Sequence, residues 1–519
     1  MESSDRDSGD ARNYRIQVSD FGPIEHANVE FRPLTVFVGP SNTGKSYFAT
    51  LSYAVHRHFA ASRDPSWYVF KRYTGTAVRK PAWTPEPEAL SELESWMSAV
   101  IEDRDPPRRS ERVLEMVRMG IENADRMADL LQEEIVRSFG SGGTRELIRQ
   151  LGTGRAKIVL SPDGFRNRGS LSYSVRMSGD ELEMEGEVLG SPDPSSRSAS
   201  AVGSWLWLQP SRLEVWLHSA SDESGGAGSP GRRTAIARQL LEWLVESQRQ
   251  DLVAPLARMA YYLPADRTGI MHIHKMVVSA IVQSAASAGL RRTPDVPKLS
   301  GVLTDFLDVL IRMGDWIGAE PARGIRSGVA SQLERDILGG TVRVDASETN
   351  YPQFFYRPDG WSSDLVLMRS SSMVSELAPL VLYLRHVVRT GDVLIVEEPE
   401  SHLHPAMQVQ VINLLARVVR EGVRIIVTTH SEWILTGLAN IVQASRIDGG
   451  NGPDGVVAPA LPEQQVGAWR FFPDGATKGV VVEEVKMDGD GMYPSEFDEV
   501  AVDLHNRWAE IESRAGESE

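Results

Sequence analysis

Apolar residues along the chain form distinct patterns, and each pattern predicts a different element. The continuous apolar run at 393–396 is typical of a strand that is covered on both faces of a parallel sheet, and the strand formers at 34–38 and 424–429 predict two further strands. Strict alternation of apolar and polar residues at 171–177 and 182–188, on either side of a Ser-Gly-Asp turn, predicts a β-hairpin. The chain therefore contains both buried parallel strands and a hairpin.

Apolar residues also recur at helical spacing. The segments with this spacing are 111–136, 234–246, 303–317 and 407–420. The last of them lies between two of the buried strands, and strands that alternate with helices predict an α/β fold with its ligand at the carboxyl ends of the strands. The stretch 219–233 is rich in Gly, Ser and Pro, which predicts a flexible loop.

One octapeptide, Gly39-Pro40-Ser41-Asn42-Thr43-Gly44-Lys45-Ser46, fits the phosphate-loop pattern at every fixed position. An apolar strand leads into it and a helix pattern follows, which is the context that the motif requires. Its glycines let the backbone wrap around phosphates, and N–H groups at the helix start point at the anion. We expect Lys45 to reach the β- and γ-phosphates and Ser46 to hold Mg²⁺, whereas the alternative is a chance glycine-rich turn.

Two glutamates, Glu397 and Glu398, directly follow the buried strand at 393–396. Hydrolysis needs one carboxylate near the metal and another that activates water, so we assign Glu397 to Mg²⁺ through a water and Glu398 to the attacking water. His430 follows the next buried strand, and such strand ends meet at one edge of a sheet. An exposed acidic turn is the alternative, and the pairing with His430 argues against it.

Composition limits the classes of function. The 519 residues suffice for about two to four domains. A net charge of -16 provides no global basic field for nucleic acid, although a local groove could still bind it. The absence of cysteine excludes disulfides and thiol nucleophiles and suits a reducing cytoplasm. No apolar stretch is long enough to cross a membrane, and residues 1–13 lack the apolar core of a secretory signal.

Several segments together resemble the ABC-type ATPases of the OLD (overcoming lysogenization defect) group, relatives of the SMC and RecF-like ATPases. The segments that carry this resemblance are 21–24, 38–46, 396–405 and 428–431. It covers about residues 14–60 and 361–442, with a looser match over 467–508. The resemblance implies an α/β fold with an ABC-type P-loop NTPase core, in which helices flank a mixed sheet, and a large α+β insertion lobe.

The resemblance also implies a role for each matching residue. Gly39 to Ser46 would be the Walker A loop, and Glu397 and Glu398 would be the Walker B pair. His430 would be the switch histidine that contacts the γ-phosphate, and His404 would occupy the D-loop position. Most of these ATPases have aspartate in place of Glu397, which keeps the charge but changes the reach to Mg²⁺.

The signature segment, which in the family completes the partner's site across a dimer, would be residues 370–377. Met373 stands where glycine usually allows close backbone approach to the γ-phosphate, so Ser371 or Ser372 would donate to it instead. A second interpretation is a serine N-cap in front of a helix over 374–383. Both can hold, because a capped helix N-terminus also binds phosphate.

The middle of the chain carries little of the resemblance. Residues 261–269 are typical of a core strand and a turn, and we favour a surface position for Arg267 over one that faces the nucleotide or the dimer partner. His272 and His274 have no carboxylate or cysteine set nearby, so we interpret them as surface histidines rather than a metal pair. The insert lacks the sustained heptads of a coiled coil, which predicts a compact lobe that binds a partner or senses a signal.

The end of the chain leaves little room for the Toprim nuclease domain that many OLD-group proteins carry. The acidic residues near 483–490 are too close together for two parallel strands with a crossover helix, so we predict a hairpin and no nuclease activity. Residues 497–511 have the pattern of an amphipathic helix, which we expect to pack on the ATPase core.

These observations divide the chain into consecutive parts. The parts are a disordered tail (1–13), the first half of the ATPase domain (14–60), an insertion lobe (61–350, returning to the core near 255–270), the second half of the ATPase domain (351–450), a C-terminal hairpin and helix (451–513) and a tail (514–519).

The predicted function is that of an ATPase that dimerises head to tail, or forms a higher homo-oligomer, on ATP. The resemblance implies that it gates a separate effector protein in prokaryotic defence against phage or foreign DNA, as in PARIS-type or Septu-type systems. One alternative is a RecF- or SMC-like ATPase that clamps on DNA, which needs a basic groove. Another is the ATPase subunit of a transporter, against which the large insert and the altered signature argue.

Overall fold

The computed structural model describes residues 12–61, 86–101, 111–122, 125–163, 170–189, 252–274, 299–319, 328–345, 352–446, 459–475, 478–487, 491 and 495–516, with isolated residues between 234 and 249. The loop predicted at 219–233, most of the helix predicted at 234–246 and nearly all of the two expected tails lie outside these residues.

One mixed sheet of eleven strands organises the described chain, in the order β6-β5-β4-β1-β2-β14-β13-β3-β12-β11-β7. The strands are β1 (Tyr14–Phe21), β2 (Ile24–Phe31), β3 (Leu34–Val38), β4 (Arg155–Pro162), β5 (Ser170–Ser178), β6 (Glu181–Leu189), β7 (Ala260–Leu263), β11 (Val393–Glu397), β12 (Arg424–Thr429), β13 (Val466–Pro473) and β14 (Val480–Glu484). Strands β13, β3, β12, β11 and β7 run parallel to one another, whereas β6, β5, β4, β1 and β2 form antiparallel pairs. The predicted mixed α/β sheet is therefore confirmed.

The parallel strands separate two hydrophobic cores. Successive side chains of a strand point to opposite faces, and along β11 the residues Val393 and Ile395 belong to one core while Leu394 and Val396 belong to the other. All four are buried, which explains why β11 has a continuous apolar run instead of an alternating one.

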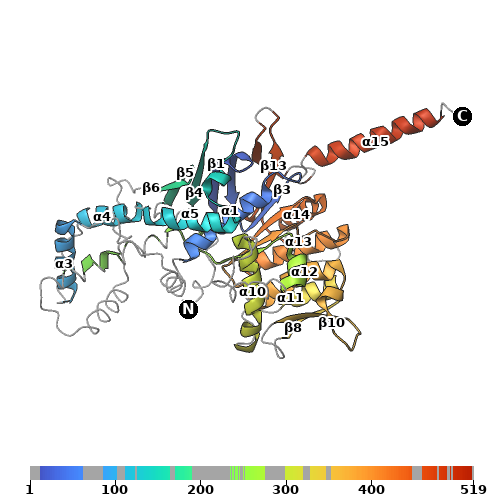
Figure 1. Ribbon diagram of the computed structural model, residues 1–519, viewed down its shortest axis with the longest axis horizontal. Coiled ribbons are helices and arrows are strands. Elements are labelled where there is room, and N and C mark those ends of the chain that lie inside the picture. Colours follow the sequence, from blue (N-terminus) through green and yellow to red (C-terminus); the bar gives the residue numbers. More distant parts are fainter. Residues whose placement is uncertain are drawn as a thin grey trace, which may run out of the picture.

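Helices cover both faces of these strands. The α-helices of the described chain are α1 (Lys45–Ala61), α3 (Pro87–Ile101), α4 (Glu111–Glu122), α5 (Asp125–Phe139), α10 (Gly301–Ala319), α11 (Gly328–Leu333), α12 (Ser372–His386), α13 (Pro405–Arg420), α14 (Glu432–Ser445) and α15 (Ser495–Gly516). Buried residues of α1 and α5 belong to the first core, whereas those of α12, α13 and α14 belong to the second. Figure 1 shows α12, α13 and α14 gathered together beside the parallel strands. A small separate sheet of β8 (Gly340–Asp345), β9 (Gln353–Pro358) and β10 (Leu365–Val366) precedes α12.

The hairpin predicted around Ser178-Gly179-Asp180 is confirmed as β5 and β6, but it does not stand apart from the ATPase core. Strand β4 pairs antiparallel with β1, from Tyr14 opposite Pro162 to Ser19 opposite Lys157, and β5 then pairs with β4. A strand edge presents unpaired N–H and C=O groups, and β4 satisfies those of β1. The described part of the expected insertion lobe thus continues the main sheet at one end, and β7 extends it at the other.

The C-terminal hairpin is also part of this sheet. Strands β13 and β14 pair antiparallel and lie between β3 and β2. The sequence predicts the hairpin around 480–490, but β14 pairs with β13, which precedes it, and residues 488–490 lie outside the described residues. The expectation that the final helix packs on the core is wrong. Helix α15 projects away from the rest of the chain (Figure 1), and its apolar side chains Leu504, Trp508 and Ile511 are more than 60% exposed. The amphipathic pattern identified the helix, but no described element covers Leu504, Trp508 or Ile511.

None of the described helices combines the length and the apolar character that a membrane-spanning segment requires.

Replacement of Gly39 by alanine is expected to destabilise the fold. Gly39 has a φ of 142°, and a Cβ there would lie 2.2 Å from the carbonyl oxygen of Phe471 in β13. We expect Gly39→Ala to lower the free energy of unfolding by at least about 2 kcal/mol, because both the backbone and β13 must shift. The matched control is Gly154→Ala, where φ is 74° and nothing lies within 4 Å. A denaturant titration in which both variants lose the same free energy would contradict this account.

Candidate ATPase site

The register of the parallel strands brings distant segments to one edge of the sheet. Val38, the last residue of β3, lies opposite Thr429 of β12, and Thr428 lies opposite Glu397 of β11. The residues that follow these pairs are therefore neighbours at the carboxyl ends of the strands, where α/β proteins bind ligands. They are the start of the phosphate loop, His430 and Glu398.

The phosphate loop connects β3 to α1, as the motif requires. Lys45 is the first residue of α1 and is buried, and its Nζ donates to the carbonyl oxygens of Gly39 at 2.8 Å and Pro40 at 2.6 Å. Thr43 Oγ1 also donates to Pro40 at 2.8 Å, whereas Ser46 is exposed. The carbonyl groups of the loop thus hold the ammonium group of Lys45. It lies beside the first N–H groups of α1, which have no hydrogen-bond partner within the helix.

Burial shifts the protonation of Lys45. Removal from water lowers the pKa of its ammonium to about 8, although the negative charges of Glu398 and Glu400 oppose the shift. With a pKa of about 8, the ammonium of Lys45 is mostly charged at neutral pH.

Glu398 and His430 form the pair predicted at the sheet edge. Glu398 Oε1 lies 3.3 Å from His430 Nε2, and Ser401 Oγ donates to Glu398 Oε2 at 3.4 Å. The hydrogen bond from His430 lowers the pKa of the Glu398 carboxyl group, so it is ionised at neutral pH. Glu398 has a φ of 41°, a left-handed backbone conformation that non-glycine residues rarely adopt and that often occurs at functional sites.

Glu397 is placed differently from its neighbour. It is the last residue of β11, it is buried, and its Oε2 accepts a hydrogen bond from the backbone N–H of Ala265 at 3.0 Å. One of its two oxygens is thus held by the turn that follows β7. This contact orients the carboxylate that the sequence assigns to the metal.

Glu400 is a site residue that sequence reasoning missed. Its Oε1 accepts hydrogen bonds from Thr429 Oγ1 at 2.6 Å and from the backbone N–H of His430 at 2.7 Å. Glu400 thereby fixes the backbone of His430 relative to the loop after β11. Burial raises the pKa of Glu400. The only sequence signal was a third acidic residue in the Glu-Glu-Pro-Glu run.

The serines of the predicted signature segment begin α12. Ser371 is its N-cap and accepts a hydrogen bond from the backbone N–H of Val374 at 3.3 Å, so the N-cap interpretation is confirmed. Ser371 and Ser372 are exposed, and among the described residues no hydrogen bond connects them with the phosphate loop of the same chain. His404 is likewise exposed and caps α13, with Nδ1 accepting from Ala406 N.

Two interpretations from sequence are corrected around β7. Arg267 is not on the surface, because only 1% of it is exposed and its guanidinium is surrounded by backbone carbonyls. His274 is also buried, with Nδ1 2.7 Å from the carbonyl oxygen of Met271. Polar residues after a strand usually face solvent, but here the small sheet and α12 cover them.

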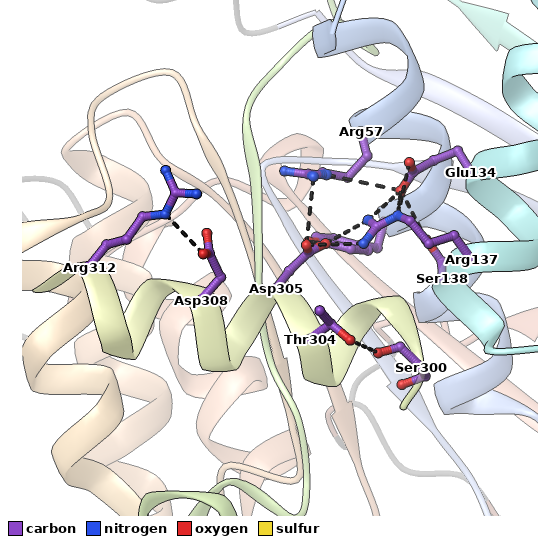
Figure 2. A network of polar contacts seen from close by, with 10 residues as sticks. Arg57, Glu134, Arg137, Ser138, Ser300, Thr304, Asp305, Asp308 and Arg312 are labelled. Atoms are coloured by element: carbon purple, nitrogen blue, oxygen red, sulfur yellow. Dashed lines mark hydrogen bonds and ion pairs between the residues drawn. The ribbon is translucent and has the colours of Figure 1, made fainter. Parts of the chain in front are cut away.

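A polar cluster anchors the helix that follows the phosphate loop (Figure 2). Asp305 of α10 accepts from Arg137 of α5 at 2.6 Å and from Tyr53 of α1 at 2.7 Å, and it lies 3.7 Å from Arg57 of α1. Arg137 also donates to Glu134 at 2.7 Å. Although burial opposes it, these hydrogen bonds and charges lower the pKa of Asp305. The cluster fixes α1 to two helices from the expected insertion lobe.

Comparison with known proteins finds one family model that matches part of the chain. Residues 344–435 match a family model described as an AAA ATPase domain. This part of the chain is therefore similar to an ATPase domain. The matched range includes Ser371, Ser372, Glu397, Glu398 and His430, while the phosphate loop lies outside it. The mixed sheet with its flanking helices confirms the predicted α/β fold of the core, whereas membership of the OLD group stays a prediction.

The solved structures to which the chain shows similarity include three SMC heads. One is an SMC head bound to the C-winged helix domain of ScpA, with 10% identity, 92% of this chain and 98% of that chain covered, and a TM-score of 0.36. Another is the SMC head domain from Thermotoga maritima, with 11% identity, 92% and 99% coverage, and a TM-score of 0.34. A third, from Pyrococcus furiosus with an extended coiled coil, has 10% identity, 95% and 98% coverage, and a TM-score of 0.34. No curated protein matches the chain.

Nucleotide binding is expected to depend on pH through Lys45. The ammonium has its pKa near 8, and only its charged form attracts phosphate, so affinity is retained below this pH and lost as the pH rises through it. Titration of a fluorescent ATP analogue should show a dissociation constant that increases up to about tenfold per pH unit above pH 8. The Lys45→Arg variant, which stays charged, is the control for effects on the analogue itself. Equal pH profiles for the two proteins would contradict the role of Lys45.

Proposed function

We propose that this protein is a magnesium-dependent ATPase that hydrolyses ATP through Glu398 and closes head to tail with a second copy when ATP is bound. The observation that carries the proposal is the placement of Glu398. Its carboxylate is ionised, hydrogen-bonded to His430, and located at the sheet edge where the phosphate loop begins. A carboxylate in this position can orient water towards a bound phosphate.

The donors and acceptors at the sheet edge suit ATP and Mg²⁺. Lys45 supplies a positive charge, and the N–H groups of the loop over Gly39–Ser46 and the start of α1 supply donors for phosphate oxygens. The exposed hydroxyl of Ser46 and the carboxylate of Glu397 are oxygen ligands of the kind that Mg²⁺ accepts, the latter through a water. Bound magnesium would offset the charge of the β- and γ-phosphates.

The other residues at this sheet edge would position and activate the attacking water. Glu398 would accept its hydrogen bond and take up its proton, while His430 would hold that carboxylate and reach the γ-phosphate from the adjacent strand. Glu400 would keep His430 in place through its backbone N–H.

The proposed dimer explains the position of Ser371 and Ser372. Both are exposed at the N-terminus of α12, a fifteen-residue helix whose first N–H groups are available to an anion. Because they have no hydrogen bond to their own phosphate loop, they would donate to the γ-phosphate of a second copy. The exposed His404 would lie at the same junction.

We further propose that ATP-driven closure gates a separate effector protein in prokaryotic defence against phage or foreign DNA. This part is supported by the resemblance of the segments around the phosphate loop, Glu398 and His430 to the OLD group.

The variant Glu398→Gln tests the proposed reaction. Glutamine keeps the size of the side chain but cannot take up a proton, so we expect ATP hydrolysis to fall by about 100- to 10,000-fold while ATP still binds. With hydrolysis blocked, the dimer should accumulate in ATP, as measured by light scattering after gel filtration.

The control is Glu512→Gln on the exposed helix α15, which should hydrolyse ATP at the native rate. Native turnover by Glu398→Gln would refute the assigned base, and a monomer at high protein and ATP concentrations would refute the shared site.

A further inference from the structure

Arg267 occupies a buried position between the end of β11 and helix α12. Its Nη1 donates to the carbonyl oxygens of Pro264 at 3.0 Å and Glu397 at 2.5 Å, and its Nη2 donates to that of Glu398 at 3.2 Å. Its Nε donates to the carbonyl oxygen of Glu376, and Nη2 lies 2.5 Å from the carboxylate of the same residue. One side chain therefore holds the backbone of the two Walker B-type glutamates and the second turn of α12.

The guanidinium is suited to this linkage for a physical reason. It is planar and presents its donors in a fixed fork, so the acceptors that it binds must keep their relative positions. Arg267 and Glu376 are each only 1% exposed, and a buried charge that loses its partner is costly. If α12 is displaced, Arg267, the Glu397–Glu398 backbone, or both must therefore move with it.

Further contacts join the start of α12 to the same turn. Thr268 Oγ1 donates to a carboxylate oxygen of Glu376. Ser375 Oγ lies 3.2 Å from Ser370 Oγ and 3.3 Å from His272 Nε2. Residues 267–274 are helical and follow β7, so one short segment contacts both the serine-rich N-terminus of α12 and the end of β11.

We propose that Arg267 is a positioning residue that couples the two ATP sites of the dimer, by linking Ser371 and Ser372 to the backbone that carries Glu398. The inference rests on the proposed function. ATP in one copy draws the serines of the other copy towards its γ-phosphate. Through α12 and Arg267, that contact sets the position of Glu398 for the second copy's own ATP. Each site then hydrolyses efficiently only when the other is occupied.

The coupling predicts cooperative hydrolysis. Steady-state hydrolysis by the full-length native chain, measured against ATP concentration, should give a Hill coefficient above 1 and up to about 2, the number of sites. In Arg267→Lys, which keeps the charge but loses the fork, we expect the coefficient to fall to about 1. The value of kcat should fall by about 10- to 100-fold, because Glu398 is no longer held. Affinity for a fluorescent ATP analogue should change less than about twofold, because Arg267 does not contact the phosphate loop.

The matched control is Arg385→Lys. Arg385 lies on the same helix, at the end remote from Ser372, and pairs with the buried Glu334 at 2.5 Å. This variant should keep the native Hill coefficient and kcat. A milder variant, Thr268→Val, removes only the hydrogen bond to Glu376 and should lower the Hill coefficient without loss of folded protein.

The outcomes separate the inference from the proposed function. If the native protein has a Hill coefficient of about 1, the inference is overturned while the proposed function stands. The same holds if Arg267→Lys and Thr268→Val both keep the Hill coefficient of the native protein. An equal loss of kcat in Arg267→Lys and Arg385→Lys also overturns it, because it would reflect general damage to α12. If the native chain does not hydrolyse ATP, the proposed function fails and the coupling fails with it.

Discussion

The parallel pairing of β12 with β3 on one side and β11 on the other is the constraint on which the site depends. It brings Gly39, Glu398 and His430 to one edge of the sheet, although more than 350 residues separate Gly39 from each of the other two. The pairing requires apolar side chains on both faces of each strand. Val393 and Ile395 fill one core and Leu394 and Val396 fill the other, so burial on both faces stabilises the strand.

Around this edge, buried polar side chains hold the loops that the strands alone would leave free. Glu400 fastens His430 by its backbone N–H, and Arg267 fastens Glu397 and Glu398 by their carbonyl oxygens. These contacts hold backbone atoms, so they fix the backbone positions from which the functional side chains extend. The phosphate-loop helix is held in a comparable way by Asp305, to which residues of α1 and α5 converge (Figure 2). The site is thus positioned by both halves of the ATPase domain and by the segment between them.

The parts of the site that depend on local sequence were predictable, and those that depend on distant contacts were not. The phosphate loop and the acidic end of β11 can each be identified from about ten consecutive residues, because the strand, turn and helix signals are adjacent in the sequence. Arg267 does not, since its partners Glu376 and Glu397 lie 109 and 130 residues away and nothing beside it indicates burial. The pairing of β4 with β1 escaped prediction for the same reason. Helix α15 shows the opposite limit, because its amphipathic pattern identified a helix but could not identify what its apolar face contacts.

The central claim is that one chain supplies the phosphate loop and a second copy supplies Ser372. The native chain has no cysteine, so a variant with both Ser41→Cys and Ser372→Cys carries these two thiols and no others. Both positions are exposed. In the hydrolysis-deficient background, a short bifunctional thiol reagent should join two chains covalently when ATP is present, and neither single-cysteine chain should be joined. The absence of a covalent dimer, or the same yield with and without ATP, would contradict the shared site.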